Sequence, residues 1–232
     1  MRRHHDRSDT QLLGNRERDV RNGFAIPPRL SAGEVAGMAF KLPWLLRMRR
    51  ALPKITFGNY KRPGSGEDLT ALAERMLSLP DPGFTWRDIE WLRGVWQGPL
   101  VLKGILHPAD AKEAVAHGVD GVIVSNHGGR QLDGTAAALD ALAGVAEAAA
   151  GGTAVLLDGG IRRGNHVIKA LALGADCCLI GRPQLWGLAV AGEAGVAHVL
   201  EIFRREIDLT MGLCGLSAID QIGSDTLLAR CR

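Results

Sequence analysis

The sequence predicts an α/β fold organised around a parallel β-sheet. Four short apolar runs occur at regular intervals after residue 99, and each is followed by a stretch of helical composition. The runs are apolar throughout rather than alternating in polarity, which is typical of strands that are buried on both faces. We expect strands at 100–103, 121–125, 154–158 and 177–181, and crossover helices at 108–118, 135–150, 165–174 and 192–212.

The part of the chain before these units follows a different pattern. Prolines and glycines are scattered through residues 14–65, which indicates a long irregular segment with one short helix near 42–50. Amphipathic stretches then predict helices at 67–79 and 85–95, with Thr85 as the N-terminal cap of the second. The pattern assigns no further strand before residue 99.

Two architectures accommodate four βα units. A complete (β/α)8 barrel requires about 250 residues and eight strands, whereas the units here occupy residues 99–212. The chain therefore forms either half of such a barrel or a doubly wound sheet. The second architecture lacks its usual marker, because no G-x-G-x-x-G follows a strand and no G-x-x-x-x-G-K-[ST] occurs. Dinucleotide-binding and P-loop proteins are therefore disfavoured.

Composition and charge narrow the functional classes further. A chain of 232 residues with 46% hydrophobic residues predicts one domain and excludes a disordered protein. The net charge of +3 is uneven, because residues 1–61 carry 13 Lys and Arg against 5 Asp and Glu. This basic part suits nucleic acid, an anionic membrane or an anionic substrate. Nucleic acid is the least favoured of these partners, because aromatic residues make up only 5% of the chain.

The cysteines indicate whether the protein contains disulfides or a metal site, and the N-terminal sequence indicates its cellular location. Cys177, Cys178, Cys214 and Cys231 form no C-x-x-C pair, so neither a disulfide framework nor a metal site is expected. We interpret them as packing residues, with Cys177 and Cys178 facing the core. The chain has no run of 18 apolar residues and no signal-peptide pattern, which predicts a cytoplasmic protein.

Polar residues and glycines follow each predicted strand. Because the carboxyl ends of parallel strands meet at one edge, these residues are expected to lie close together. Glycine backbone N–H groups and arginine guanidinium groups after the last two strands suit a phosphate. His127 can accept a proton near neutral pH, and Arg130 can bind a carboxylate. Lys103 offers a positive charge to a developing anion, so the pattern suggests a phosphorylated cofactor beside a small organic acid.

Four segments make the sequence similar to a known family. They are SNHGGRQLDG (125–134), LLDGGIRRGNHVIKALALGAD (156–176), IGRP (180–183) and GEAGV (192–196). They resemble the FMN-dependent 2-hydroxy acid oxidases and dehydrogenases, such as glycolate oxidase, L-lactate dehydrogenase and mandelate dehydrogenase. The resemblance runs from about residue 9 to residue 228 and implies the C-terminal half of a (β/α)8 TIM barrel, strands five to eight.

The resemblance also implies a division of the chain. Residues 1–24 correspond to the end of strand four and an active-site segment, and residues 25–66 form an irregular basic loop. Residues 67–232 form the half-barrel with the FMN phosphate site. The implied activity is FMN-dependent oxidation of a small L-2-hydroxy acid to its 2-oxo acid.

The same resemblance assigns roles to individual residues. His127 is the general base, oriented by Asp9, and Arg16 and Arg130 hold the substrate carboxylate. Lys103 lies near the flavin ring, and Ser125 contacts the flavin. The remaining residues surround the ribityl chain and the phosphate: Asp158, Gly159, Gly160, Arg162, Gly181 and Arg182.

The first half of the family's barrel has no counterpart in this sequence. A half-barrel exposes two strand edges and one apolar sheet face, which predicts a homo-oligomer, weak FMN binding and little turnover. Two other functions therefore stay open. One is a truncated, non-catalytic remnant that binds FMN or phosphate weakly, and the other is a membrane-surface binding module.

The segment 39–54 supports a membrane contact. It combines phenylalanine, tryptophan and leucines with five Lys and Arg residues, a composition suited to a membrane interface. It resembles in place and character the loop that attaches some bacterial mandelate and lactate dehydrogenases to the inner membrane. Those enzymes pass electrons to quinone instead of oxygen, so either acceptor is expected here. The alternative location is therefore peripheral, at the inner face of the plasma membrane.

Overall fold

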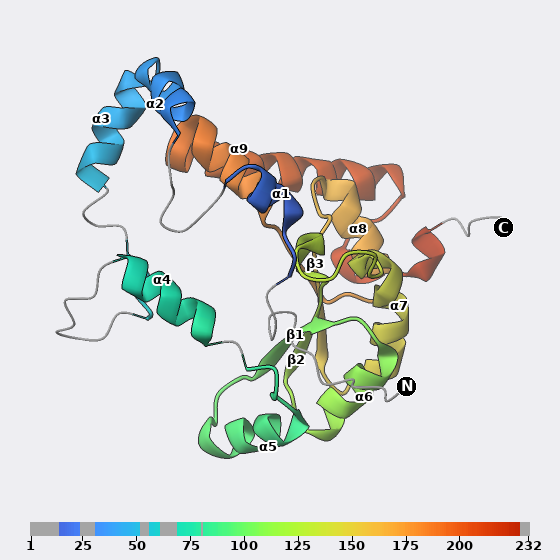
Figure 1. Cartoon of the computed structure of the whole chain (residues 1–232). Coiled ribbons are helices and arrows are strands. Elements are labelled where there is room, and N and C mark those ends of the chain that lie inside the picture. Colours follow the sequence, from blue (N-terminus) through green and yellow to red (C-terminus); the bar gives the residue numbers. More distant parts are fainter. Residues whose placement is uncertain (1–13, 24–30, 52–55, 61–68, 80, 228–232) are drawn as a thin grey trace. The chain divides into compact units, whose positions relative to one another are not determined.

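The computed structural model describes residues 14–23, 31–51, 56–60, 69–79 and 81–227 (Figure 1). The chain divides into two compact units. One consists of Asn15–Asp81, and the other combines the N-terminal residues up to Gly14 with Pro82–Arg232. The βα pattern lies in the second unit.

The second unit contains a sheet of four parallel strands in the order in which they occur along the chain. This consecutive order is that of a barrel segment, because a doubly wound sheet reverses its strand order at a switch point. The strands are β1 (Val101–Ile105), β2 (Gly121–Val124), β3 (Ala154–Asp158) and β4 (Cys177–Leu179). The crossover helices are α6 (Pro108–Ala116), α7 (Ala138–Ala149) and α8 (Gly164–Ala172), and they lie along one side of the sheet (Figure 1).

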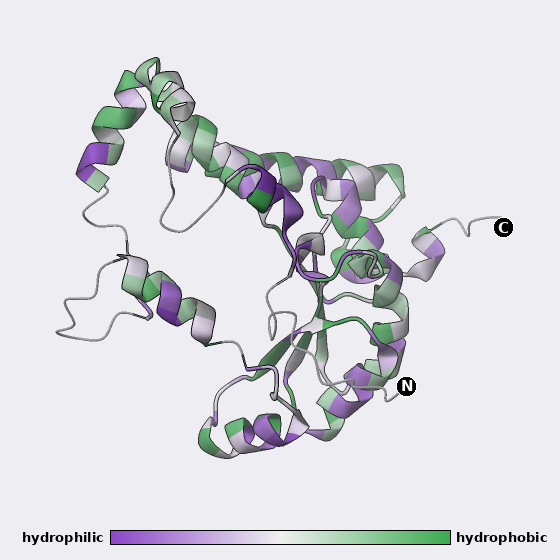
Figure 2. Cartoon of the chain, in the orientation of Figure 1, coloured by the Kyte–Doolittle hydropathy of each residue, from purple (hydrophilic) through white to green (hydrophobic). Residues whose placement is uncertain are grey.

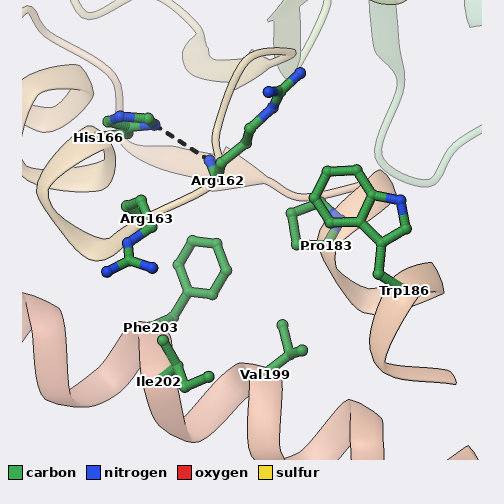
Figure 3. Close-up of a pocket in the computed structure, with 8 residues that line it drawn as sticks. All are labelled: Arg162, Arg163, His166, Pro183, Trp186, Val199, Ile202 and Phe203. Atoms are coloured by element: carbon green, nitrogen blue, oxygen red, sulfur yellow. Dashed lines mark hydrogen bonds between the residues drawn. The ribbon is translucent and has the colours of Figure 1, made fainter. Parts of the chain in front are cut away.

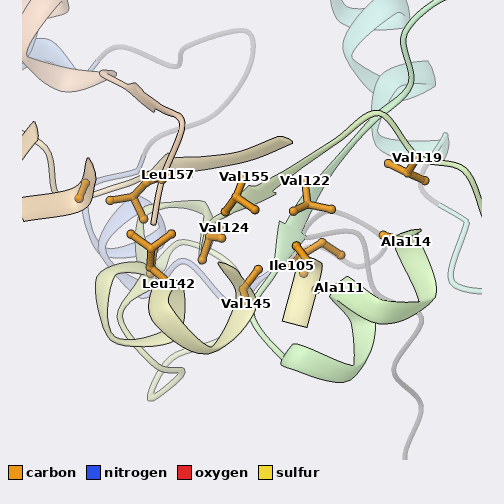
Figure 4. Close-up of a cluster of buried hydrophobic side chains, with 14 of the residues drawn as sticks. Ile105, Ala111, Ala114, Val119, Val122, Val124, Leu142, Val145, Val155 and Leu157 are labelled. Atoms are coloured by element: carbon orange, nitrogen blue, oxygen red, sulfur yellow. The ribbon is translucent and has the colours of Figure 1, made fainter. Parts of the chain in front are cut away.

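The hydrophobic core lies between the sheet and these helices. Val122, Val124 and Leu157 are fully buried against Leu142 and Val145 of α7 (Figure 4). Successive residues of a strand point to opposite faces of a sheet. The other face of the sheet carries residues that remain partly exposed, including Val101, Ile123 and Leu156. The sheet therefore has one closed face and one open apolar face.

Helix α5 (Trp86–Val95) is attached to the start of the sheet. Its N-terminal cap is confirmed, since the Thr85 N–H and hydroxyl donate to the Asp88 carboxylate at 2.6 and 2.9 Å. Near its other end, Arg93 Nη1 lies 2.7 Å from Asp120 Oδ2, which also accepts a hydrogen bond from the Leu100 N–H. Asp120 thus joins α5 to the loops that precede β1 and β2.

The last helix, α9 (Arg182–Leu213), begins earlier than the sequence predicts. Pro183 occupies its first turn, a position that suits proline, although the prediction starts the helix only at residue 192. Ala191 and Gly192 leave the helical conformation, and Gly187 packs directly against the backbone of Gly195. Among the described helices, α9 alone has the length and hydropathy of a membrane span. The break divides it into two segments that pack on each other.

The prediction that the cysteines pack in the core is wrong for two of them. Cys177 and Cys214 are exposed, and Cys231 lies outside the described residues. Cys177 begins β4, which has a neighbouring strand only on its β3 side in the described part of the sheet. Cys178 does pack against the core. Burial raises the pKa of its thiol to about 11, with a further contribution from Cys177.

The unit of residues 15–81 is helical. It contains α1 (Glu17–Arg21), α2 (Ala32–Ala39), α3 (Leu42–Ala51) and α4 (Leu69–Ser78), and Figure 2 shows their mixed hydropathy. The helices near 42–50 and 67–79 are found, but α1 and α2 lie in the segment that the sequence predicts to be irregular. The glycines at 33 and 37 favoured that interpretation of α2, yet alanines surround them and support a helix.

Replacing Asp120 by Asn should lower the stability at neutral pH. Hydrogen bonds from the Leu100 N–H and from Arg93 hold the pKa of this carboxyl below its ordinary value of 3.8. A carboxyl with a lowered folded-state pKa stabilises the protein above its unfolded pKa, and the contribution is lost as the pH falls through the folded value. In urea unfolding, the wild type should therefore have a higher free energy of unfolding than Asp120→Asn at neutral pH. In acid the two free energies should be similar. Asp133→Asn, at an exposed loop position, should have the same unfolding curve as the wild type at neutral pH and in acid.

Candidate functional site

The carboxyl ends of the first three strands are joined by side-chain hydrogen bonds. Lys103 Nζ, at β1, donates to Ser125 Oγ, after β2, at 3.0 Å. The Ser125 hydroxyl donates to Asp158 Oδ2, at the end of β3, at 2.9 Å. Lys103 Nζ also lies 3.2 Å from Asp158 Oδ2. The three residues form a closed network at one rim of the sheet, as the parallel arrangement of the strands predicts.

The predicted base follows this network directly. The His127 N–H donates to Ser125 Oγ at 3.0 Å, and Asn126 Oδ1 accepts from the Gly129 N–H at 3.2 Å. His127 has a φ of 54°, which is uncommon for a residue with a side chain and is typical of functional sites. The turn therefore holds the imidazole at the rim, with Arg130 exposed immediately after it. Sequence reasoning assigned no role to Asn126, whose side chain closes the turn.

The loops after β3 and β4 supply groups that suit an anion. Gly159 and Gly160 have φ values of 114° and 77°, which expose their backbone. A Cβ atom built on Gly160 or Gly181 would meet nothing within 4 Å, so the backbone is open there. Among the described residues, neither Arg162 nor Arg182 forms an ion pair with a carboxylate. Two guanidinium groups beside open glycines are a suitable cradle for a phosphate.

Arg182 connects this cradle to the turn that carries His127. Its Nη2 atom lies 3.2 Å from the position that a Cβ atom on Gly128 would occupy. Arg182 begins α9 directly after β4, whereas Gly128 belongs to the loop after β2. The predicted phosphate site and the predicted base therefore share one rim.

A pocket of about 440 Å³ lies between α8 and the two segments of α9 (Figure 3). In Figure 3 the Arg162 side chain extends away from the apolar floor that Val199, Ile202 and Phe203 form. The Arg162 guanidinium is 5.9 Å from the ring centroid of Trp186. Arg163 Nη2 is paired with Glu206 Oε1 at 2.6 Å. The pocket is therefore largely apolar, and it shares Arg162 with the predicted anion cradle.

The positions of two predicted site residues relative to the rim are not described by the structure. Asp9 is outside the described residues. Arg16 belongs to the unit of residues 15–81, where it precedes α1. Their roles beside His127 remain predictions, as do the cofactor and substrate roles of the residues at the rim. The described residues contain no group of three His, Cys, Asp or Glu side chains placed to hold a metal ion.

Comparison with known proteins gives consistent similarities. The FMN-dependent dehydrogenase family model matches residues 7–229. The 2-hydroxyacid oxidase 1 of Mus musculus is 47% identical over 216 residues, which are 92% of this chain and 53% of that protein. The L-lactate oxidase of Nostoc sp. is 44% identical over 220 residues, 94% of this chain and 54% of that protein.

A solved structure shows the same similarity in three dimensions. The crystal structure of the monotopic membrane protein (S)-mandelate dehydrogenase has a TM-score of 0.88 at 39% sequence identity, covering 95% of this chain and 58% of that one. The chain spans about half the length of the curated relatives that it matches.

Gly128→Ala should weaken anion binding at the rim. A left-handed φ costs a residue with a side chain about 1–2 kcal/mol, and the new methyl group would also displace Arg182. Gly118→Ala is the matched control, because Gly118 has a φ of +66° and no atom within 4 Å of its Cβ position. Thermal unfolding should show similar destabilisation in both variants. Calorimetric titration with inorganic phosphate should show weaker binding only in Gly128→Ala, and equal phosphate affinities would contradict the role of Arg182.

Proposed function

Because the chain belongs to the FMN-dependent dehydrogenase family, we propose that it supports the FMN-dependent oxidation of a small L-2-hydroxy acid to the 2-oxo acid. Its four parallel βα units correspond to half of the (β/α)8 barrel of these enzymes. The observation that carries the proposal is the single rim on which His127, Lys103 and Arg182 meet. Similarity to 2-hydroxyacid and lactate oxidases supports a substrate of the lactate, mandelate or glycolate type.

The residues of the rim fit FMN. The phosphate would be held by the backbone at Gly159, by the open backbone at Gly160 and Gly181, and by the guanidinium groups of Arg162 and Arg182. Lys103, paired with Asp158 and Ser125, would place a positive charge beside the flavin ring. FMN, when bound, supplies the acceptor for two electrons from the substrate.

The side chains of the chain itself handle the substrate and its proton. His127 accepts the proton that the substrate releases, and because Nδ1 is buried we assign that proton to Nε2. Arg130, exposed three residues further on, binds the substrate carboxylate, and Arg16 provides a second guanidinium for it. Asp9 would stabilise the protonated imidazole. These roles follow the family resemblance and agree with the chemistry of each group.

Arg182→Ala should weaken FMN binding by about 10- to 150-fold, because a hydrogen bond to a charged group contributes about 1.5–3 kcal/mol. Quenching of flavin fluorescence on titration of the full chain measures the affinity. Arg205→Ala, which removes an exposed arginine paired with Glu201 on α9, should leave the affinity unchanged. Wild-type protein that leaves flavin fluorescence unquenched would contradict the proposed function.

The second candidate is a non-catalytic protein that binds FMN or phosphate weakly, and it rests on the open backbone of the cradle at Gly160 and Gly181. It would retain the phosphate cradle and lack turnover. Reduction of a dye acceptor with lactate, glycolate or mandelate distinguishes the two candidates. Turnover that disappears in His127→Gln supports oxidation, and FMN binding without turnover supports the second candidate.

We also propose that the segment 39–54 contacts a membrane surface. Phe40 is 92% exposed and Leu46 is 63% exposed, so apolar side chains are presented to solvent. Arg49 and Arg50 occupy the last turn of α3 and suit anionic headgroups. The similarity to a monotopic membrane protein supports this contact. A quinone is then the more suitable electron acceptor, and oxygen is the alternative.

Trp44→Ser together with Leu46→Ser should reduce membrane binding at least tenfold, since both side chains contribute apolar area to the interface. Flotation with vesicles of phosphatidylglycerol and phosphatidylethanolamine measures the membrane binding. High salt should weaken the binding of the wild-type protein. Trp91→Ser is the control, because Trp91 on α5 is 66% exposed, more than the 46% of Trp44, and lies outside this segment. Equal losses in the variant and the control would contradict a specific membrane contact.

Self-association has support from the sheet. In the described part of the chain, β1 and β4 each pair with a strand on one side only, and Val101 of β1 is exposed. Open edges and exposed apolar residues favour pairing with another copy. Homo-oligomerisation therefore remains part of the proposal.

A further inference from the structure

Gly14 lies against a loop that is distant in the sequence. It is the one residue of the segment 1–14 that the structure describes, and it belongs to the same unit as the sheet. Its N–H donates to Gln131 Oε1 at 3.3 Å, across 117 positions of the chain. Gln131 directly follows Arg130 in the loop after β2. The contact therefore joins the N-terminal segment to the loop that carries a predicted substrate-binding arginine.

The two backbones approach so closely that only glycine fits at position 14. A Cβ atom built there would overlap the Arg130 carbonyl oxygen, and it would lie 2.5 Å from the Gln131 carbonyl oxygen and 2.6 Å from Gln131 Cα. All three are backbone atoms, which cannot turn aside as the end of a flexible side chain can. Gly14 is not among the described glycines with a positive φ. The close approach, and not the conformation of Gly14 itself, therefore requires the glycine.

The backbone of the loop is permissive on its own. Gly128 and Gly129 have φ values of 67° and 71°, and glycine loses more conformational freedom on folding than any other residue. The Asn126 side chain holds the start of the loop, because its Oδ1 atom accepts from the Gly129 N–H at 3.2 Å. Gly14 meets the loop at the next residue, Arg130. It therefore restrains the part of the loop from which the arginine side chain extends.

We propose that Gly14 is a positioning residue that fixes the backbone of Arg130 and, through it, the guanidinium group. The role of Arg130 toward a substrate carboxylate rests on the proposed function, whereas the contact between Gly14 and its backbone does not. A guanidinium group binds a carboxylate best through two parallel hydrogen bonds, and this geometry requires a defined direction. Gly14 supplies no group to the substrate or to FMN and acts only through Arg130.

A methyl group at position 14 would disturb the loop in one of two ways. Either the N-terminal segment would move off the loop, or the carbonyl groups of Arg130 and Gln131 would move away from it. In both cases Arg130 would lose its defined backbone position, and small displacements of a binding group have large effects on positioned interactions. Affinity for the substrate carboxylate should therefore fall. FMN affinity should be kept, because Asn126 still holds the turn beside Arg182.

The test compares Gly14→Ala with Gly58→Ala in the full chain. Gly58 is the matched control, because it also lies outside helices and strands, has no positive φ and has no atom within 4 Å of its Cβ position. The first measurement is the ¹H–¹⁵N NMR signal of the Arg130 Nε–H in the FMN-free chain, assigned with Arg130→Lys.

Two affinities complete the test. Calorimetric titration of the FMN-loaded chain measures the binding of 2-hydroxyisobutyrate, a 2-hydroxy acid without an α-hydrogen, which cannot be oxidised to a 2-oxo acid. Quenching of flavin fluorescence measures the binding of FMN. General loosening of the fold would weaken both ligands, whereas a displaced Arg130 weakens only the acid.

Gly14→Ala should shift the Arg130 signal and weaken 2-hydroxyisobutyrate binding by about tenfold or more, the effect of losing one hydrogen bond to a charged group. Its FMN affinity should equal that of the wild type, and Gly58→Ala should change none of the three measurements. Gln131→Ala removes the side-chain acceptor of the Gly14 N–H without adding bulk. It should give smaller changes of the same kind, which keeps the test decisive if Gly14→Ala does not fold.

Three results would overturn the proposal. The first is an Arg130 signal in Gly14→Ala that coincides with the wild type. The second is a loss of FMN affinity by the same factor as the loss of acid affinity, and the third is an equal shift of the Arg130 signal in Gly58→Ala. Failure of the wild type to bind FMN or the acid would contradict the proposed function alone, and the Arg130 signal would still decide the role of Gly14.

Discussion

The parallel pairing of consecutive strands is the constraint on which the rest of the structure depends. Because β1, β2 and β3 run in the same direction in register, the residues at their carboxyl ends arrive at one rim. Lys103, Ser125 and Asp158 come from separate segments of the chain, yet they lie within hydrogen-bonding distance of each other. The chemistry at this rim follows from the topology of the sheet, and the loops then add the imidazole and the guanidinium groups.

The two faces of the sheet differ in a way that follows from the same topology. Crossover helices cover one face and bury Val122, Val124 and Leu157 completely. The residues that alternate with them along the strands, such as Ile123 and Leu156, are only partly buried. In a closed (β/α)8 barrel such residues fill the interior. The apolar side chains and backbone groups of this four-stranded sheet that still lack packing or hydrogen-bond partners therefore lie on its open face and along its two edge strands.

Much of the βα region is predictable from sequence, because its signals are local. Continuous apolar runs locate the four strands, and the Thr85 cap locates the start of α5. The exposure of Cys177 is not predictable in this way, because Cys177 is in register with Leu156 and shares the open face of the sheet. The first segment of α9 was missed because glycines and a proline mask its helical composition. The network around Ser125 requires contacts across three strands, and no local pattern reports them.

The backbone contact between Gly187 and Gly195 links the chemistry to a distant part of the chain. The first segment of α9 begins at Arg182, and its second segment holds the start of α8 through Glu206, which accepts from the Gly164 N–H at 2.7 Å and pairs with Arg163. The loop of Arg162 directly precedes that point. The two packed segments of α9 thus connect Arg182 to the loop that carries Arg162. A larger side chain at either glycine would push the two segments of α9 apart. It would thereby displace the arginines of the cradle without contacting them.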